Sequence, residues 1–346
     1  MTLTFKKLTA AAIAATALAG SGVALAQEIT LKFQHIWPAA GATPVQTIQP
    51  WCNKIAAESN NKMKCQVFAS MSAGGTPPQL VDRVKDGVDD LVMTLPGYTA
   101  GRFPSLEVFE LPFMTNQAEA ASKAVWEFAQ KYSLKEFPGT KVLAAWVHDE
   151  GYIHTAGKQV KTMADLKGMK IRSPHRSGLK MLNALGASPI AMSIVGVQDA
   201  VSKGTLDGAM VPWEAASDFR ISDVAKFSTE TPQSRPAMYT AVLVFLMNQA
   251  KYDSLTPELK AVIDRNSGLQ LSGAFGKRWD DSLVPAKKAM VAKGSQVYVL
   301  PAAEVDQWMK TVEPVTTEWI ADMEKRNLPA KAMMSDAKAL LAKHKK

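Results

Sequence analysis

Residues 165–214 constrain the fold of this chain more than any other stretch, because they place one charged side chain on a strand that otherwise has a buried composition. In the hexapeptide MKIRSP, Arg172 interrupts the alternation of a short strand, and Pro174 ends regular pairing. A helix with an apolar face follows, for which we expect Ser177 to be the N-cap and Gly186 the C-terminal stop.

The same stretch continues through a second strand, SPIAMS, a second helix over residues 197–203 and a third strand over residues 206–211. Parallel strands joined by helices bring their carboxyl ends to one edge of the sheet, where open α/β sheets bind ligands. Arg172 and Trp213 both lie at such ends. A planar guanidinium beside an indole suits a small carboxylate with a flat or apolar tail. The alternative interpretation makes Arg172 part of a structural salt bridge and Trp213 part of the core.

Three motifs in this order, DLKGMKIR, LGASPIAM and AVSKGTLDGAMVPWE, resemble the second domain of the solute-binding proteins of TRAP (tripartite ATP-independent periplasmic) transporters, the DctP family. The segment DLVMTLPGYTAGRFPSLEVFELPF and the Trp-rich C-terminal region extend the resemblance over nearly the whole mature chain. The resemblance implies that Arg172 binds a ligand carboxylate and that the membrane subunits of a TRAP permease are the partner. It also implies an α/β fold of two lobes, each a mostly parallel sheet flanked by helices, with a long helix running along both lobes.

The length of the chain also favours two lobes, because a mature chain of about 320 residues exceeds what one hydrophobic core usually serves. We expect the first lobe to comprise residues 27–149 and 238–277, the second lobe residues 150–237 and 278–310, and the C-terminal helices that pack across the lobes residues 311–346.

Within these lobes, apolar periodicity predicts the remaining elements. We predict strands over residues 29–33, 63–68, 90–95, 142–147, 239–248 and 296–300 and helices over residues 44–59, 79–86 and from residue 303 onwards, with Trp308, Trp319 and Met323 in the core. Residues 259–293 are predicted to be one long helix, kinked at Ser267 and Gly268, or two helices.

Several side chains of the first lobe fall at the ends of predicted strands, namely His35, Trp37, Met93 and Tyr98. Because these strand ends share one edge, we expect the four side chains to form the first lobe's side of a cleft. Each of them alone is more often a core residue than a ligand contact. Tyr239, where the chain returns to the first lobe, joins this set of candidates.

Two positions depart from the branch of the family that binds sialic acid. That branch has a second arginine shortly after a glycine like Gly151, where this chain has Ile153 and His154, and an asparagine where this chain has Val211. The loss of these polar groups, together with the aromatic Trp213, favours an aromatic or hydrophobic monocarboxylate, a 2-oxo acid or a 2-hydroxy acid. A dicarboxylate or a sugar acid is the alternative. His154 remains available to orient a carboxylate or a hydroxyl group.

Two further residues near the strand ends are candidates. Arg176 begins the helix after Arg172 and offers a second cationic contact, with a surface arginine as the alternative. Glu214 is the residue through which a bound cation would reach the ligand, although no motif supports one. We predict no cofactor and no metal site. The candidate ligand contacts are therefore Arg172, Trp213, His154, Glu214, Arg176, His35, Trp37, Met93, Tyr98, Val211 and Tyr239.

Residues 1–26 have the features of an export signal. Lys6 and Lys7 precede an apolar, alanine-rich run, and Ala24-Leu25-Ala26 is a small-x-small cleavage site. We predict cleavage after Ala26 and a soluble periplasmic protein. An uncleaved membrane anchor is the alternative, but the apolar run is short for a membrane span.

Charge and cysteine content agree with an exported binding protein. Without the two lysines of the signal, the 40 basic residues fall to 38 against 32 acidic ones, a net charge of about +6. The basic residues are dispersed, which argues against nucleic-acid binding, and a mild positive field suits anionic ligands. Cys52 and Cys65 fit an oxidising compartment and are candidates for a disulfide bond, with two free buried thiols as the alternative.

A periplasmic enzyme is the rival class of function. The chain has five histidines and several acids near them, but it has no HExxH, GxSxG or cysteine-histidine arrangement. A signalling or scaffolding protein with the same fold is a third class. We therefore predict a monomeric binding protein that is not an enzyme.

Overall fold

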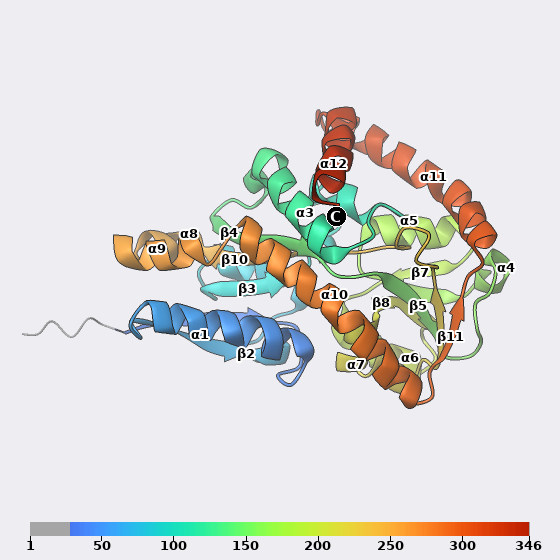
Figure 1. The fold of residues 1–346 in the computed structure, drawn as a ribbon, viewed down its shortest axis with the longest axis horizontal. Helices are drawn as coiled ribbons and strands as arrows, with labels where there is room; N and C mark the ends of the chain where they lie inside the picture. Colours follow the sequence, from blue (N-terminus) through green and yellow to red (C-terminus); the bar gives the residue numbers. More distant parts are fainter. Residues whose placement is uncertain (1–27, 346) are drawn as a thin grey trace, which may run out of the picture.

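The structure, a computed structural model, describes residues 28–345 and consists of two lobes, each built on its own β-sheet (Figure 1). The two-lobe α/β architecture expected from the sequence is confirmed. The predicted signal, residues 1–26, lies outside the described residues. Within residues 28–345, none of the helices has the length and apolar composition needed to cross a membrane.

The first lobe contains a sheet of five strands. These strands are β1 (Ile29–His35), β2 (Met63–Phe68), β3 (Leu91–Thr94), β4 (Thr140–Val147) and β10 (Val242–Asn248). Their order is β2-β1-β3-β10-β4, with β1, β2 and β3 parallel and β10 antiparallel to both of its neighbours. The antiparallel direction places the first residues of β10 at the same edge as the carboxyl ends of β3 and β4.

The second lobe contains a sheet of six strands. They are β5 (Gly151–Thr155), β6 (Lys170–Ser173), β7 (Ser188–Ala191), β8 (Gly208–Pro212), β9 (Phe227–Glu230) and β11 (Gln296–Val299), in the order β11-β9-β5-β8-β6-β7. β6 pairs in parallel with both β7 and β8, whereas β5 runs antiparallel to β8 and β9. The parallel unit predicted around Arg172 is therefore present as β6, β7 and β8 with two intervening helices.

Helices cover both sheets and link the lobes. Those of the first lobe are α1 (Gln49–Glu58), α2 (Leu80–Lys85), α3 (Ala118–Tyr132), α8 (Gln249–Asp253) and α9 (Pro257–Arg265), and those of the second are α4 (Met163–Leu166), α5 (Arg176–Ala184), α6 (Val197–Ser202) and α7 (Trp213–Asp218). The helices that link the lobes are α10 (Leu269–Ala292), α11 (Ala302–Lys325) and α12 (Ala330–His344).

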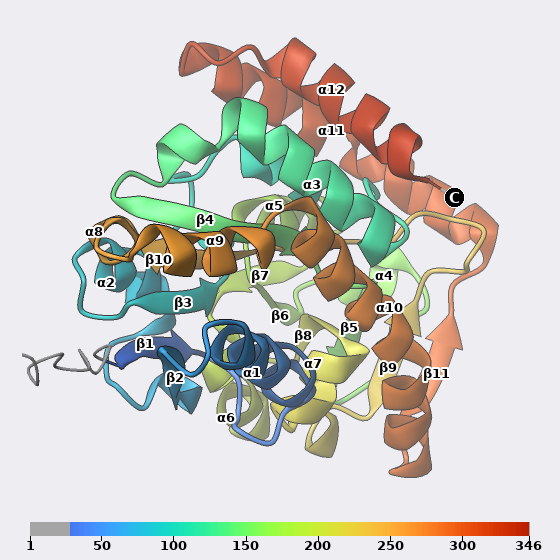
Figure 2. The same ribbon diagram turned by 60° about the vertical axis from the view of Figure 1, so that its left-hand side comes forward.

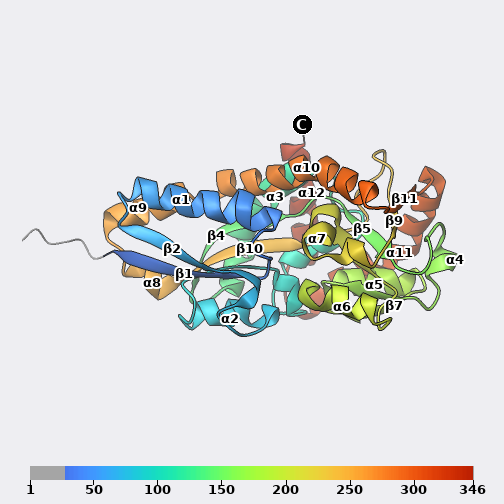
Figure 3. The same ribbon diagram turned by 90° about the horizontal axis from the view of Figure 1, so that it is seen from below.

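The long helix α10 runs along both lobes, as Figures 1 and 3 show. It crosses α3 of the first lobe at Gly276, where a Cβ atom would lie 2.3 Å from the backbone oxygen of Ala118. It then packs against α7 of the second lobe. Gly268, with a φ of +87°, separates α9 from α10, so residues 259–293 form two helices. A left-handed backbone at this position favours glycine.

The C-terminal helices form a layer over both lobes (Figure 2). α11 packs on α5 of the second lobe, and α12 packs on α3 of the first lobe. An ion pair of 2.7 Å between Lys343 of α12 and Glu127 of α3 reinforces the second contact. Trp308, Trp319 and Met323 of α11 are buried, as predicted.

Sequence patterning missed several elements, among them α3, α7, β5 and β9. All the residues of β5 are buried, so this strand lacks the alternation that reveals a half-exposed strand. The helix predicted over residues 44–59 begins with a π-helical turn, Pro44–Ile48, before α1.

A disulfide bond joins Cys52 of α1 to Cys65 of β2, with the Cα atoms 5.7 Å apart. Neither cysteine is a free thiol. The two residues are separated by 13 positions in the sequence. Closing a loop of this size restricts the unfolded chain and contributes about 3 kcal/mol in the chain-entropy model.

Replacing both cysteines, Cys52→Ala with Cys65→Ala, should lower the free energy of unfolding by about 2–4 kcal/mol. Urea titration followed by tryptophan fluorescence measures the change. Wild-type protein treated with dithiothreitol should lose a similar amount, and the double variant should not respond to the reductant. Equal midpoints for the wild type and the variant would show that the bond contributes nothing to stability.

Candidate functional site

A cavity enclosing about 380 Å³ of atom-free space, its mouth included, lies between the two lobes. The first lobe contributes Ile36, Trp37, Leu95, Tyr98, His148, Tyr239 and Leu243, the second contributes Arg172, Pro174, Ile194, Val211, Pro212, Ala215 and Phe219, and α10 contributes Trp279. Most of these residues lie at or just after the carboxyl ends of β1, β3, β4, β6 and β8, which is the edge where the sequence predicted a ligand site.

Arg172 supplies the only formal charge in the lining of the cavity. Its side chain is 2% exposed, and its guanidinium donates from Nε to the backbone oxygen of Met192 (2.8 Å) and from Nη1 to that of Met210 (3.0 Å). These bonds occupy two of the five N–H groups that a guanidinium carries. Among residues 28–345 no carboxylate lies within 4.0 Å of Arg172, so the structural salt bridge considered as an alternative is not formed there. A buried cation without an anionic partner is costly unless a ligand provides one.

Two tyrosines of the first lobe lie near this guanidinium. The Tyr98 hydroxyl accepts a hydrogen bond from the backbone N–H of Ile194, at 3.3 Å. Burial raises the pKa of Tyr98 and of Tyr239, and the Arg172 charge opposes the rise in both. The ring of Tyr239 is held between His148 and His175, with centroid distances of 5.4 and 5.9 Å. Both phenols therefore stay protonated and can donate to an anion.

His148 contributes an uncharged ring to the cavity. Its Nε2 accepts a hydrogen bond from the backbone N–H of Ala241 (3.0 Å), which leaves the proton on Nδ1, 2.6 Å from the backbone oxygen of Asp149. Burial lowers the pKa of His148 to about 4. Both nitrogens are thus engaged by the backbone, and a ligand contacts the ring only through carbon atoms.

The structure brings five of the sequence candidates to this cavity: Arg172, Trp37, Tyr98, Val211 and Tyr239. The remaining residues that line the cavity were not among the ligand contacts predicted from the sequence. His148 follows the predicted strand 142–147 directly, so the strand-end rule pointed to it. Phe219 and Trp279 lie on or after helices, and no sequence signal separates them from core residues.

Trp213 and His154 lie behind the cavity wall, in the core of the second lobe. Trp213 is the first residue of α7, and its Nε1 donates to Glu230 (2.7 Å) while its ring packs against His154. The two nitrogens of His154 lie 2.9 Å from the Ser228 hydroxyl and 3.1 Å from the backbone oxygen of Val211. Burial lowers the pKa of His154 to about 4. The sequence predicted that both side chains line the cavity, but neither does. Each is held by hydrogen-bond partners within the second lobe.

His35, Met93 and Glu214 are also outside the cavity lining. His35 and Met93 are fully buried in the first sheet, with the His35 ring 6.0 Å from that of Trp37, and burial lowers the pKa of His35 to about 4. Glu214 forms an ion pair with Arg278 of α10. Arg278 already neutralises the carboxylate of Glu214, so this carboxylate does not require a bound cation as a partner. Within residues 28–345 no group of three or more His, Cys, Asp or Glu is arranged to hold a metal ion.

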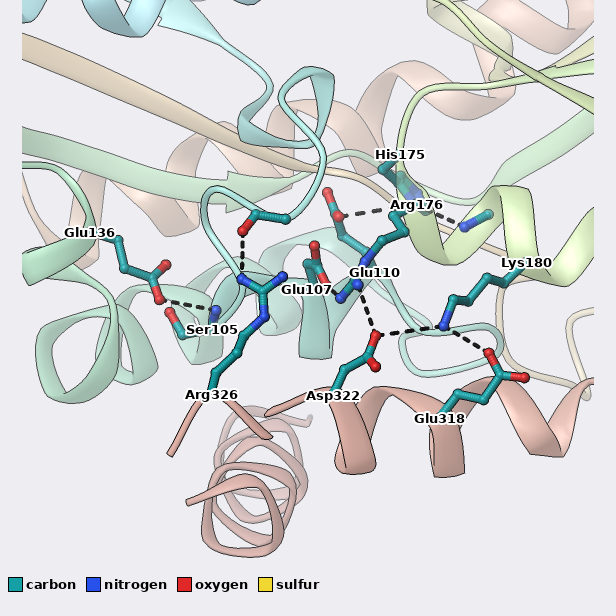
Figure 4. Close-up of polar contacts among 12 residues, drawn as sticks. Ser105, Glu107, Glu110, Glu136, His175, Arg176, Lys180, Glu318, Asp322 and Arg326 are labelled. Atoms are coloured by element: carbon teal, nitrogen blue, oxygen red, sulfur yellow. Dashed lines mark hydrogen bonds and ion pairs between the residues drawn. The ribbon is translucent and has the colours of Figure 1, made fainter. Parts of the chain in front are cut away.

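Besides the bond between Ile194 and Tyr98, polar contacts hold the lobes together at two further places. At the first, the backbone N–H of Ala42 donates to Asp218 of α7 (2.8 Å), and the Thr43 hydroxyl donates to Glu214 (3.2 Å). At the second, shown in Figure 4, Arg176 of α5 pairs with Glu107 of the first lobe at 2.5 Å. We call this arrangement, in which both places are in contact, the closed form.

Arg176 is therefore a lobe-to-lobe contact and lies outside the lining of the cavity. Besides Glu107 it binds Asp322 of α11, at 2.9 Å (Figure 4). The helix that begins at Arg176 is capped by His175 rather than by Ser177: Nδ1 of His175 accepts the N–H of Gly178 (3.0 Å). The side chain of His175 reaches the first lobe as well, with Nε2 2.9 Å from the backbone oxygen of Thr240.

Glu110 is buried beside this second contact. It accepts a hydrogen bond from the backbone N–H of Val242 (3.0 Å), and Nδ1 of His175 lies 3.9 Å away. Burial raises the pKa of Glu110 to about 8, and the charge of Glu107 adds to the rise while Arg176 opposes it. The carboxyl group is therefore protonated at neutral pH.

Two lobes closed over a cavity with one buried cation that has no carboxylate partner among the described residues are the arrangement of a solute-binding protein. The chain belongs to bacterial extracellular solute-binding protein family 7 (DctP), whose sequence profile matches residues 33–322. Proteins of this family serve TRAP transporters: they bind small carboxylate ligands outside the cytoplasm and work with membrane permease subunits.

Two solved structures resemble this one over almost its full length. A TRAP solute-binding protein from Rhodoferax ferrireducens, in complex with copurified benzoate, is 42% identical with a TM-score of 0.90, covering 91% of this chain and 98% of that one. A TRAP solute-binding protein from a marine metagenome, specific for aromatic acid ligands and bound to 3-hydroxybenzoate, is also 42% identical with a TM-score of 0.90, covering 92% and 100%. The outer membrane transporter protein TsaT of Comamonas testosteroni is 26% identical over 323 residues, 92% of this chain and 93% of its own length.

Replacing Glu110 by glutamine should flatten the pH dependence of stability. The folded-state pKa of about 8 exceeds the ordinary value of 4.5, so the stability linked to this proton is complete below pH 4.5 and is lost as the pH rises towards 8. The loss is about 1.4 kcal/mol per pH unit within that window. Glu110→Gln retains an acceptor for the N–H of Val242 and cannot ionise, so the variant should lack this loss.

Urea unfolding at pH 5, 6, 7 and 8 measures this slope. Glu318→Gln, which changes an exposed carboxylate of α11 in the same cluster, is the matched control and should keep the wild-type slope. An unchanged slope in Glu110→Gln would contradict the assignment of a neutral Glu110.

Proposed function

We propose that this chain captures a small aromatic monocarboxylate in the periplasm and delivers it to a TRAP permease. The observation that carries the proposal is the Arg172 guanidinium, which is buried without a carboxylate partner among the described residues at the edge of an apolar cavity. The ligand carboxylate completes this ion pair. A charge-assisted hydrogen bond of this kind contributes about 1.5–3 kcal/mol.

The apolar part of the cavity lining favours a ring. Its walls include Ile36, Val211, Ala215, Phe219 and Leu243, none of which offers a side-chain donor or acceptor. Burying a group the size of a phenyl ring contributes about 1.5–3 kcal/mol, comparable to the contribution of the head group. The tail therefore determines affinity as much as the carboxylate does.

The same lining disfavours a second charge on the ligand. Arg172 is the only lysine or arginine among the lining residues, and the nitrogens of His148 are occupied by the backbone. A dicarboxylate would have to bury its second carboxylate without a counter-charge, which costs several kcal/mol. Benzoate and 3-hydroxybenzoate, bound by the two proteins of similar structure, carry a single carboxylate on a ring.

The proposal includes no chemistry on the ligand. His148 is the only histidine in the lining of the cavity, and its tautomer is fixed by Ala241 and Asp149, so it has no free nitrogen to act as a general base. The protein then acts by population shift, because contacts made from both lobes exist only in the closed form.

A panel of acids tests the ligand class. Mature protein freed of copurified ligand by unfolding and refolding should gain thermal stability with benzoate, 3-hydroxybenzoate and phenylpyruvate, and not with succinate, malate or gluconate. At about 100 times its dissociation constant a ligand stabilises the folded state by about 2.7 kcal/mol. A gain confined to dicarboxylates or sugar acids would overturn the proposed ligand class.

Arg172→Ala should weaken the binding of the best aromatic acid by about 2–5 kcal/mol, because it leaves a buried carboxylate unpaired. Isothermal titration calorimetry measures the loss, and circular dichroism checks the fold. Arg235→Ala removes an arginine of the second lobe that pairs with Asp306 at the surface, and it should bind like the wild type. Equal affinity of Arg172→Ala and the wild type would contradict the assignment of the carboxylate site.

A further inference from the structure

Tyr98 is placed to connect the two lobes through the ligand. It ends the short helical turn Pro96–Tyr98, which follows β3 in the first lobe, and its hydroxyl oxygen accepts the N–H of Ile194 in the second lobe. Tyr98 and Arg172 both line the cavity, and the phenol oxygen lies within hydrogen-bonding reach of the guanidinium. Tyr98 therefore joins one lobe to the charged group of the other.

The hydroxyl proton of Tyr98 is still available to a ligand. In its hydrogen bond with Ile194 the phenol oxygen is the acceptor, and within residues 28–345 the hydroxyl donates to no acceptor. Beside it, the guanidinium of Arg172 has N–H groups beyond the two that donate to Met192 and Met210, and no carboxylate of the described residues accepts from them. A carboxylate has two oxygens, so one can accept from Arg172 of the second lobe while the other accepts from Tyr98 of the first.

Gly97, the residue before Tyr98, lies in close contact with the second lobe in the closed form. A Cβ atom at Gly97 would lie 2.7 Å from Cβ of His175 in the second lobe and 3.3 Å from a carboxylate oxygen of Glu110 in its own lobe. The backbone of Gly97 is not left-handed, so alanine suits its conformation. The closed form requires a glycine at this position because His175, at the start of α5, packs directly against it. Separation of the lobes would remove this contact.

We propose that Gly97 and Tyr98 form a carboxylate sensor in the first lobe: Tyr98 donates to the carboxylate that Arg172 holds, and Gly97 leaves the space in which the two lobes can meet around it. The inference rests on the proposed function and assigns closure to the carboxylate rather than to the ring. A ligand shifts the open–closed equilibrium only through contacts that differ between the two forms. The bond from Tyr98 is such a contact, because in the open form the carboxylate on Arg172 has left the first lobe.

Two substitutions test the sensor. Tyr98→Phe keeps the ring and removes the hydroxyl, and it should weaken benzoate binding about ten-fold to a hundred-fold, the usual loss for a hydrogen bond to a charged group. Gly97→Ala leaves Arg172 and Tyr98 unchanged but obstructs their approach. It should weaken benzoate binding and reduce the benzoate-induced decrease in the radius of gyration measured by small-angle X-ray scattering, while the ligand-free protein keeps its melting temperature.

Matched controls separate these effects from general damage. Gly157→Ala adds a methyl group at a glycine with no atom within 4 Å of the new Cβ, and Tyr298→Phe removes a hydroxyl of β11, which lies outside the lining of the cavity. Both controls should bind benzoate and compact like the wild type. Benzamide, which has the ring without the charge, should not compact the wild-type protein at concentrations where benzoate does.

The outcomes distinguish this inference from the proposed function. Benzoate binding by Tyr98→Phe within two-fold of the wild type, or full compaction of Gly97→Ala, would overturn the sensor and leave the proposed function standing. Failure of the wild type to bind any aromatic acid would overturn the proposed function and the sensor together. If Gly97→Ala does not fold, Tyr98→Phe decides the question.

Discussion

The structure depends on one incomplete ion pair. Arg172 is buried at the carboxyl end of β6, where the backbone oxygens of Met192 and Met210 fix its guanidinium, and no carboxylate of the described residues neutralises it. A charge in this position costs free energy until an anion arrives. In the proposed function the carboxylate of the ligand offsets this cost, which favours acids over neutral rings. The remaining cavity has only to exclude water and fit the tail.

The two sheets bring this cation and its surroundings together by the same topological rule. Ligand sites form where the carboxyl ends of parallel strands meet, and here the relevant edges of two sheets face each other. The antiparallel β10 extends the rule, because its start places Tyr239 at that edge. Each lobe alone has half of a site. Arg172 lies in the second lobe and the two phenols in the first, so the proposed recognition and closure would depend on the same groups.

Much of this arrangement could be predicted from the sequence, and the failures have definite causes. Arg172 could be recognised as a candidate ligand contact because a guanidinium on a buried apolar strand is unfavourable unless an anion pairs with it. The regular pattern of strand, helix and strand around it also placed it at a strand end. Trp213 was misplaced because sequence spacing shows where a strand ends but not which way the first side chain of the next helix points. The sequence suggested that the ring nitrogens of His154 are free to bind a ligand, but Nδ1 is hydrogen-bonded to Ser228, which is distant in sequence. Phe219 and Trp279 reach the cavity only through tertiary packing, for which a single sequence contains no local signal.

The C-terminal helices have a consequence for how the molecule moves. α11 is fixed to the second lobe through Asp322 and Arg176, and α12 is fixed to the first lobe through Lys343 and Glu127. The chain between the helices includes Asn327, whose φ of +59° marks a tight local turn. Any opening must therefore bend this connection together with α10 and the two segments that link the lobes, one between β4 and β5 and one between β9 and β10. This leaves few independent ways for the lobes to separate. A protein with few open conformations loses little entropy when it closes, so the ordering of the lobes offsets less of the binding energy of a ligand.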